Sequence, residues 1–350
     1  MNLEGHLSSP RSAWTSGGGE MSDVVVSSRA RLARNLDGYP FPEHLQPDPG
    51  EQVVQRVQGA VTGLGRGWEF YRLQGLSAVD RQVLLEKHLI SPQQAQSPDR
   101  AALALREDEA LSVMVNEEDH LRVQAILPGL AVGHALRLAL ETDDRLEQNL
   151  DFAFTPDRGY LTACPTNVGT GLRLSVMLHL GGLARTQRIQ QLLQVLPKLG
   201  LAVRGLYGEG TEAIGNLFQI SNQITLGQTE EEVAGGIERA ALEVIEQERQ
   251  ARRLLAENAL PEVQDRVHRA YGILRYARLL GAEEAMHLLS DLRLGTEMGL
   301  LQVPLPMVNE LLLLALPGFL SRTVGHELQP AEQRAARANL IRERLQKEVG

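Results

Sequence analysis

Four short segments of the chain combine arginines, carboxylates and glycines in a way that could handle phosphate. They are Ser27-Ser28-Arg29-Ala30-Arg31, Asn116-Glu117-Glu118-Asp119-His120-Leu121-Arg122, the turn 164–171 with Arg173, and Arg204-Gly205-Leu206-Tyr207-Gly208-Glu209-Gly210-Thr211-Glu212. Arginine matches phosphate oxygens with paired hydrogen bonds, and transfer from a triphosphate needs positive charge at several oxygens. The lysines are Lys87, Lys198 and Lys347, and none follows a Walker-type glycine loop. We therefore expect arginines to bind the phosphate and carboxylates to serve a nucleophile or Mg²⁺.

The turn from Cys164 to Gly171 predicts an anion site. A strand at 160–163 enters this glycine-containing turn, and we expect a helix to begin near Leu172 with Arg173 in its first turn. Free N–H groups at a helix N-terminus attract anions. An arginine there is unfavourable by roughly 0.3–1 kcal/mol, and a bound polyanion would reverse that sign. The alternative is a solvent-exposed arginine on a surface helix.

The other charged candidates also have structural interpretations. Arg29 and Arg31 are two residues apart, so they share one face if the strand that begins at 24–26 continues through them. Such a pair is also ordinary on an exposed edge strand. For Glu117 and Glu118, a turn of solvated acids is the default interpretation from the sequence.

Cys164 and the histidines leave similar alternatives. A lone cysteine is most often a small buried side chain, but beside a helix N-terminus it could be a reactive thiol. His88 and His120 lack partners at metal-ligand spacing, which argues against a zinc site.

The pattern around these segments predicts a mixed α and β region followed by helices. Residues 1–22 are polar and contain three consecutive glycines, which predicts a loosely held arm. We expect strands at 24–31, 112–115, 121–127, 201–204 and 217–220, and helices at 51–64, 78–89, 132–150 and 186–198. Thr229 and Glu232 form a capping box that opens a long helix, and the chain is almost continuously helical from there. The shift near residue 240 predicts two domains, 23–240 and 241–350.

The composition limits the class of protein. The chain has 350 residues, a formal net charge of −9 and 43% hydrophobic residues, which indicates about two domains with a sizeable core. Its acidity argues against general nucleic-acid binding and favours a cationic partner. A single cysteine excludes an intramolecular disulfide and fits a reducing cytosol. No run approaches the roughly 20 apolar residues of a membrane helix, so Leu311–Leu316 is interpreted as a core segment. The N-terminus lacks the apolar stretch of a signal peptide.

The four segments, taken in order, resemble the motifs of the ATP:guanidino phosphotransferases, the family of arginine and creatine kinases. Residues 28–35 followed by Tyr39-Pro40-Phe41-Pro42, together with 86–91 and 205–210, are most similar to the bacterial protein arginine kinases of that family. The resemblance implies an α+β fold in which an antiparallel sheet flanked by helices precedes an all-helical C-terminal domain. It implies transfer of the γ-phosphoryl group of MgATP to protein arginines.

The resemblance also implies roles for individual residues. Arg29, Arg31, Arg122 and Arg173 would hold the phosphates and His88 would contact the nucleotide. The nucleotide site as a whole would comprise Ser27, Ser28, Arg29, Ala30, Arg31, His88, Arg122, Arg173, Arg204, Gly205, Leu206, Tyr207, Gly208 and Glu209. Glu118 and Glu212 would grip the guanidinium, with Glu212 as the general base, and Cys164 would lie beside it. Glu117 would act on Mg²⁺ through water, and ATP would carry the metal without further protein ligands.

Two departures from the small-molecule kinases bear on the substrate, and one departure from the protein arginine kinases bears on phosphoarginine sensing. The first arginine motif begins at residue 27, which leaves no room for their helical N-terminal domain, and Tyr207 stands where they carry a further phosphate-binding arginine. Both favour a protein substrate over the alternative, a phosphagen kinase acting on free arginine. A catalytically silent adaptor is the other alternative. The protein kinases often carry a C-terminal Arg-Asp-x-x-Arg-Ala motif, which here reads Gln333-Arg334-Ala335-Ala336-Arg337-Ala338. Phosphoarginine sensing at that site is left open.

The resemblance finally suggests partners. Expected clients are proteins with exposed arginines, such as a stress-gene repressor and unfolded proteins marked for a Clp protease. A zinc-binding activator protein, a homodimer formed through the helical domain and a cytoplasmic location complete the expectation.

Overall fold

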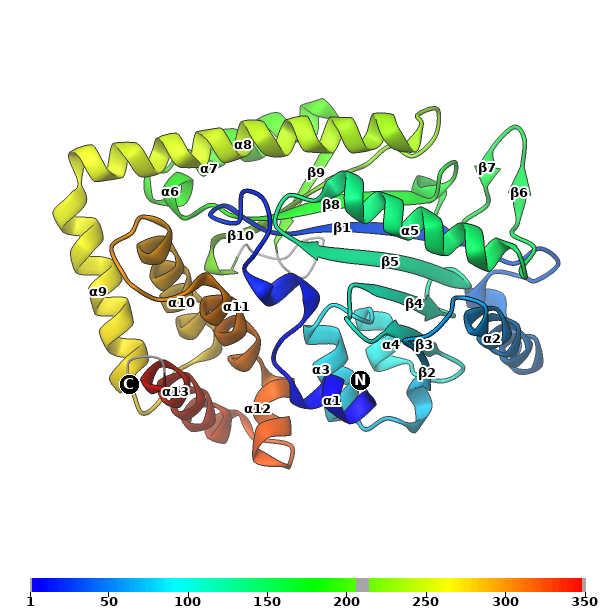
Figure 1. Ribbon diagram of the computed structural model, residues 1–350, viewed down its shortest axis with the longest axis horizontal. Helices are drawn as coiled ribbons and strands as arrows, with labels where there is room; N and C mark the ends of the chain where they lie inside the picture. The colour runs from blue at the N-terminus through cyan, green and yellow to red at the C-terminus, as the bar shows by residue number, and fades with distance from the viewer. Residues whose placement is uncertain (1, 206–213, 348–350) are drawn as a thin grey trace.

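The computed structural model describes residues 2–205 and 214–347, and its centre is an eight-stranded sheet (Figure 1). The strand order is β2-β3-β4-β5-β1-β8-β10-β9, and all neighbouring strands are antiparallel. The strands are β1 (Val25–Arg34), β2 (Trp68–Arg72), β3 (Ala102–Arg106), β4 (Leu111–Val115), β5 (Leu121–Pro128), β8 (Leu172–His179), β9 (Leu201–Gly205) and β10 (Leu217–Asn222). A separate hairpin consists of β6 (Phe154–Thr155) and β7 (Gly159–Tyr160). The predicted α+β class is confirmed.

Alternation along the central strands gives this sheet an apolar face. Ala30 and Leu32 of β1 are fully buried with apolar residues of β4, β5, β8 and β10. Helices α2 (Pro47–Thr62), α5 (Val132–Glu147) and α8 (Glu230–Asn258) cover this face. Because successive side chains point to opposite faces, Arg29 and Arg31 project from the other side. The predicted strand through the arginines is therefore confirmed, in a central rather than an edge position.

A second core closes part of the opposite face and joins it to the helical C-terminal region. It contains Met114, Ile126 and Met177 from the sheet together with apolar residues of several helices. The helices that contribute to this second core are α3 (Ala78–Glu86), α4 (Pro92–Gln96), α9 (Leu260–Tyr276), α10 (Ala282–Glu297), α11 (Leu305–Leu314), α12 (Pro317–Val324) and α13 (Pro330–Gln346). The short helices α6 (Gly181–Arg185) and α7 (Ile189–Val195) pack against the first core instead. Short 3₁₀ turns are η1 (Ala13–Ser16), η2 (Pro42–His44), η3 (Leu73–Gly75), η4 (Pro165–Asn167), η5 (Leu196–Leu199) and η6 (Ile214–Asn216).

The N-terminal segment is held against the protein, so the expectation of a loose arm is wrong. Helix α1 (Leu3–Ser8) buries Leu7, and the next turn buries Trp14, whose indole Nε1 donates to the carbonyl of Lys87 at 3.1 Å. His6 lies 2.7 Å from Glu109, which also binds Lys87. Two apolar side chains and a buried charge network therefore outweigh the conformational freedom of the glycines.

The second error concerns the stretch after Gly171, where a strand replaces the predicted helix. Residues 172–179 form β8 between β1 and β10, and most of its side chains are buried. A central strand covered on both faces reads as a nearly continuous apolar run, which periodicity alone does not separate from a buried helix. No helix therefore begins at Arg173, and only the three-residue 3₁₀ turn η4 follows Cys164.

The predicted capping box is present, since Thr229 accepts from the N–H of Glu232 at 3.2 Å and Glu232 accepts from the N–H of Thr229 at 2.9 Å. Residue 240, the predicted domain boundary, lies within the unbroken helix α8. Residues 311–315 are buried in the second core, as predicted for this segment.

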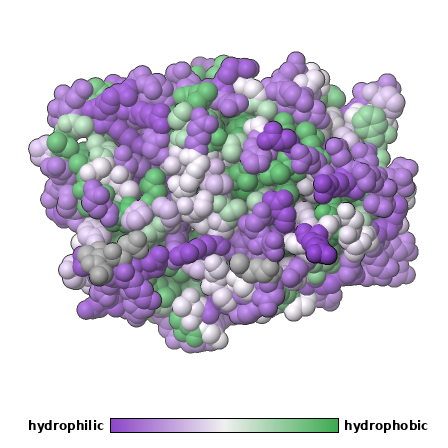
Figure 2. All heavy atoms as spheres, viewed as in Figure 1, coloured by the Kyte–Doolittle hydropathy of each residue, from purple (hydrophilic) through white to green (hydrophobic). Residues whose placement is uncertain are grey.

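No single helix among the described residues is long and apolar enough to cross a membrane, and the apolar pair α11 and α12 is bent by 80°. Figure 2 shows a face covered largely by hydrophilic residues, with apolar atoms in separate smaller patches.

Candidate active site

Four of the predicted phosphate-binding arginines lie together on the polar face of three neighbouring strands. Arg31 of β1 is directly opposite Arg173 of β8, and Gln124 of β5 flanks it on the other side. Arg29 is two residues along β1, and Arg122 is two residues along β5 from Gln124, so both share this face. The sheet register, and not a helix N-terminus, brings the arginines together.

The cluster concentrates positive charge, and Glu117 and Glu118 pair with one of its members, Arg122. Burial, followed by the charges of Arg122 and Arg173, lowers the pKa of Arg29 to about 10. Burial and the three neighbouring arginines lower the pKa of Arg31 well below its usual range, although Glu117 opposes this shift. The Nε atom of Arg31 is buried and has no hydrogen-bond partner among the described residues. A polyanion such as a triphosphate would offset the repulsion among the arginines and would accept hydrogen bonds from their guanidinium groups. The residues therefore fit ATP.

Glu117 and Glu118 lie at the edge of this cluster, in the tight turn between β4 and β5. Asn116 adopts a left-handed conformation with φ 52° and begins the turn. Glu117 is buried, with Oε2 at 2.6 Å from Nη2 of Arg122, and it accepts from the N–H of Glu118 at 2.8 Å. The Glu118 carboxylate is 40% exposed and lies 3.3 Å from the same guanidinium. Burial raises the pKa of Glu118 and nearby Asp119 and Glu117 add to the rise, whereas Arg122 opposes it.

Two residues that the sequence did not single out for function, Asn35 and Asp119, position this turn and the Cys164 loop. Asp119 Oδ1 accepts from Asn35 Nδ2 at 2.6 Å and from the N–H of Ala163 at 2.7 Å. Asn35 Oδ1 accepts from the N–H of His120 at 2.9 Å. This pair joins β1, the acidic turn and the chain before Cys164. Asp119 was visible only as one member of the motif, and nothing in the sequence paired it with Asn35.

The Cys164 loop is tied to the end of β10 and to β1. Cys164 is partly exposed, and its Sγ lies 3.0 Å from the hydroxyl of Thr166. The hydroxyl of Thr225 is 2.8 Å from the carbonyl of Thr166 and 2.7 Å from that of Val168. Gly171 has φ +66°, and a Cβ there would lie 2.6 Å from the carbonyl of Ala33. Glycine at position 171 therefore allows the loop to pass close to the backbone of β1, where a side chain would clash.

His88 lies at the opposite side of the cluster, beside the N-terminal segment. Its ring is 5.3 Å from that of Trp14, and its carbonyl accepts from Nε2 of Gln124 at 2.7 Å. Burial, followed by the charges of Arg29 and Arg31, lowers the pKa of His88 to about 3, so the ring is neutral near pH 7. Trp14 is therefore a neighbour of the predicted nucleotide site, which the interpretation of residues 1–22 as a loose arm had hidden.

The remaining predicted site residues lie on either face of the sheet, at the end of β9, or outside the described part of the chain. Arg204 of β9 pairs with Gln219, whose Oε1 accepts from Arg29 Nη2 at 2.8 Å. Ser28 and Ala30 point to the other face of β1, where Ser28 donates to the carbonyl of Gly129 at 2.8 Å. Gly205 ends β9 and Ser27 is buried on β1. Leu206, Tyr207, Gly208, Glu209 and Glu212 lie outside the described residues.

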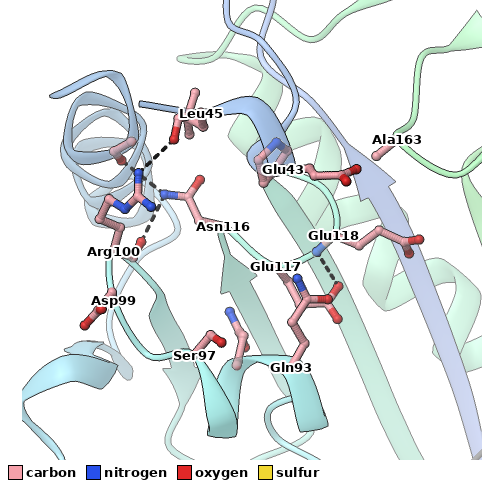
Figure 3. A pocket seen from close by; sticks show the side chains of 13 residues that line it. Glu43, Leu45, Gln93, Ser97, Asp99, Arg100, Asn116, Glu117, Glu118 and Ala163 are labelled. Carbon is pink, nitrogen blue, oxygen red and sulfur yellow. Dashed lines mark hydrogen bonds between the residues drawn. The ribbon is translucent and has the colours of Figure 1, made fainter. Parts of the chain in front are cut away.

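Within the described ranges, no group of three or more His, Cys, Asp or Glu side chains could hold a metal ion. A cavity of about 490 Å³ opens beside the acidic turn, lined by Glu117, Glu118 and Ala163 and by residues of η2, α2 and α4 (Figure 3).

Sequence comparison identifies the family of this chain. A model of the ATP:guanido phosphotransferase C-terminal catalytic domain matches residues 51–251, more than half of the chain. The chain therefore belongs to the ATP:guanido phosphotransferase family. A second model, of the protein-arginine kinase McsB C-terminal domain, matches residues 261–349. The protein-arginine kinase of Desulforamulus reducens is 50% identical over 99% of this chain and 98% of its own. That of Symbiobacterium thermophilum is 51% identical over 97% and 98%. Within the family, the chain thus groups with the protein-arginine kinases, which confirms the resemblance seen in the motifs.

Solved structures agree on the fold. Lombricine kinase superposes with a TM-score of 0.58 and 24% identity over 67% of this chain and 68% of that chain. The duplicated taurocyamine kinase from Schistosoma mansoni with bound transition state analog components gives 0.60 and 24%, over 76% of this chain and 40% of that one.

Proposed function

We propose that this protein transfers the γ-phosphoryl group of ATP to guanidinium groups of arginines in protein substrates. The observation that carries the proposal is the set of four arginines on one face of β1, β5 and β8, with Glu118 at its edge. Such a cluster repels itself in the free protein and matches a triphosphate. The relatives' name, protein-arginine kinase, supports the choice of acceptor.

In the proposed reaction, the arginines hold the phosphate oxygens and neutralise the charge that spreads over the transferred group. One guanidinium nitrogen of the substrate forms a bond to the γ-phosphorus while the bond from that phosphorus to the leaving oxygen of ADP breaks. Glu118 orients the guanidinium, and Glu212 accepts its proton. Cys164 lies beside the acceptor. Glu117 would hold, through water, the Mg²⁺ carried by ATP, and that ion would supply further positive charge to the phosphates.

The timing of the proton transfer follows from the acidities of the two groups. Full removal of a proton from arginine by an ordinary glutamate, before the attack, would cost on the order of 12 kcal/mol. We therefore expect the proton to leave as the nitrogen–phosphorus bond forms. Two carboxylates around one cation would also repel each other, which raises one pKa toward the working range.

The proposal extends to domains, partners and location. Residues 1–22 would precede a catalytic domain at 23–240, and 241–350 would serve dimerisation and substrate docking. Clients would be a stress-gene repressor and unfolded proteins marked for a Clp protease in the cytoplasm, with a zinc-binding activator protein. Arg337 of the altered C-terminal motif is buried and donates to the carbonyls of Ala315 at 2.7 Å and Leu280 at 2.9 Å. These contacts support a packing role for Arg337.

The test is to incubate the protein and its Glu212→Gln variant with MgATP and either an arginine-rich protein or free arginine. Mass spectrometry under mild conditions then maps acid-labile phosphate. We expect phosphate on protein arginines alone, and a turnover about 10²–10⁴-fold lower in the variant with ATP affinity retained. Phosphate on free arginine alone would indicate a phosphagen kinase. If the protein binds ATP but transfers phosphate to neither acceptor, even with the activator protein present, the result would favour a catalytically silent adaptor.

A further inference from the structure

His88 adopts a backbone conformation that glycine usually supplies. The N–H of Leu89 donates to the carbonyl of Leu84 at 2.9 Å, which closes a Schellman turn after helix α3. His88 occupies the left-handed position of that turn with φ 61°, and its own N–H donates to the carbonyl of Leu85 at 2.9 Å. A Cβ is disfavoured in this conformation, so a histidine in place of glycine points to a use for the ring.

Two side chains hold the peptide groups on either side of the His88 Cα. Nε1 of Trp14 donates to the carbonyl of Lys87 at 3.1 Å, which fixes the peptide before His88. Nε2 of Gln124 donates to the carbonyl of His88 at 2.7 Å, which fixes the peptide after it. Because the orientations of these two planar groups determine φ and ψ, Trp14 and Gln124 together select the conformation of His88.

The His88 ring is a neighbour of both Trp14 and the arginine cluster. Its centre lies 5.3 Å from that of the nearer ring of Trp14, with the two planes tilted by 49°. Burial and then the charges of Arg29 and Arg31 lower the pKa of His88 to about 3, so the ring is neutral beside the cluster. Gln124, which holds the His88 carbonyl, is paired with Arg31 in the sheet register. His88 is partly exposed, so a nucleotide whose phosphates bind the arginines can reach it.

Trp14 itself is shielded from such a nucleotide. It is only 3% exposed and belongs to the second core. A cavity that borders both Trp14 and His88 has a volume of about 10 Å³, which is about the space of one water molecule. A nucleotide base is far larger than this cavity. Trp14 therefore acts on a bound nucleotide through His88 and not by direct contact.

Buried charges attach the N-terminal segment to the same stretch of chain. Nζ of Lys87 donates to the carbonyl of His6 at 2.8 Å, and the Lys87 ammonium also binds the carboxylate of Glu109. Nδ1 of His6 lies 2.7 Å from that carboxylate. All three side chains are buried, so breaking this network would leave an unpaired charge out of water. The network therefore keeps Trp14 in a fixed place relative to His88.

We propose that Trp14 is a positioning residue of the nucleotide site, and that residues 3–16 are thereby part of that site. The inference rests on the proposed function for the identity of the ligand, ATP. Trp14 holds the peptide between Lys87 and His88 and packs against the His88 ring, and this ring contacts the nucleotide beside its phosphates. Loss of Trp14 therefore weakens the affinity for ATP without removing a group that takes part in phosphoryl transfer.

The test is a double-mutant cycle on the full chain, measured by calorimetric binding of MgATP and by the KM for ATP. Trp14→Leu removes the indole, and His88→Gly removes the ring while supplying the residue that the turn prefers. We expect each single variant to weaken ATP binding about tenfold, with kcat within about twofold of wild type. In the double variant the two losses should not add, because Trp14 acts through His88. Fully additive losses would overturn the inference.

Trp68 supplies a matched control, because it is the second of the two tryptophans, lies on β2 and packs against the first core. Trp68→Leu should keep the wild-type affinity for ATP even if its melting temperature falls. Trp14→Phe guards against a failure of Trp14→Leu to fold, since it keeps an aromatic ring but lacks the Nε1 donor. It should weaken binding about threefold. Wild-type affinity in both Trp14 variants, or an equal loss in Trp68→Leu, would contradict a positioning role.

Fluorescence adds a signal that a purely structural role of Trp14 would not produce. In Trp68→Phe the remaining indole is Trp14, and its emission should change saturably as ATP is added. The further change His88→Gly should abolish that response. An emission that ATP leaves unchanged in Trp68→Phe would count against the contact between His88 and the nucleotide and would overturn the inference.

The same binding data distinguish this inference from the proposed function. If ATP binds as expected in the cycle but no protein arginine is phosphorylated, the proposed kinase activity fails and the positioning role of Trp14 stands. If wild type phosphorylates arginines but ATP affinity does not depend on Trp14, the kinase activity stands and the positioning role fails. Failure of wild type to bind ATP would overturn both.

Discussion

Replacing Arg29 by methionine should stabilise the free protein while weakening its affinity for ATP. The reason is the charge balance of the cluster, since Arg122 and Arg173 repel the Arg29 guanidinium and burial removes part of its hydration. A side chain kept for packing would show the opposite sign in the free protein. The two effects together therefore separate a ligand-binding arginine from a structural one.

The magnitude follows from the lowered pKa of Arg29, about 10. Since arginine ionises above about 12 in an unfolded chain, carrying this charge costs the folded protein about 3 kcal/mol. The cost is present in full at pH 7, and it is relieved only where the folded group deprotonates, above pH 10. Losing the 2.8 Å hydrogen bond to Gln219 costs about 1 kcal/mol, and partial exposure reduces the gain further. The net stabilisation is about 1–2 kcal/mol, a rise of about 2 °C in the melting temperature of a 350-residue chain.

The assay combines thermal unfolding of the nucleotide-free protein with titration of ATP. Loss of one charge-assisted contact should weaken ATP binding by about 10- to 150-fold. Arg34→Met is the matched control on the same strand, because Arg34 is buried and its Nη2 lies 2.6 Å from Asp143. That variant should lose about 3–5 kcal/mol. A melting temperature of Arg29→Met below wild type would refute the argument that the cluster is electrostatically strained.

Two further predictions concern backbone and helix contacts. Gly171→Ala should destabilise the protein by more than about 1 kcal/mol and reduce phosphoryl transfer, since φ is +66° and the new Cβ would meet the carbonyl of Ala33; unchanged denaturation and activity would contradict this. Burial raises the pKa of Glu86 to about 7, although it accepts from the N–H groups of Gly318 and Phe319. The folded state thus holds this proton more tightly, so the free energy of unfolding should fall by up to about 3 kcal/mol from pH 5 to 8. Glu86→Gln should flatten that dependence. If the variant and the wild type show parallel profiles of unfolding free energy against pH, Glu86 is not the group responsible.

The parts of the fold that the sequence predicted well are those with local signals. Alternation placed Arg29 and Arg31 on one face of β1, and the polar run 116–120 between two apolar strands predicted the turn that holds Glu117 and Glu118. The capping box located the start of α8 because it needs only residues three apart. The motifs also identified the family, since their order and spacing do not depend on how they meet in space.

The errors arose where long-range packing decided the conformation. Residues 172–179 are apolar enough for either a buried helix or a central strand, and only pairing with β1 and β10 makes them a strand. Residues 1–22 are polar on average, but Trp14 and Leu7 find apolar surface that belongs to distant parts of the chain. Neither partner is visible within a local window of sequence.

The sequence by itself therefore determined which residues carry the chemistry, and the tertiary structure decided how they combine. Arg31 and Arg173 are 142 positions apart, and a strand register sets them opposite each other. Glu43, Asp99 and Glu118 line one cavity although they come from three separate segments. Charge and hydrogen-bonding capacity are properties of single residues, so the sequence determines them directly. Mutual repulsion, burial and unpaired acceptors depend on distances between residues, which exist only after the chain has folded.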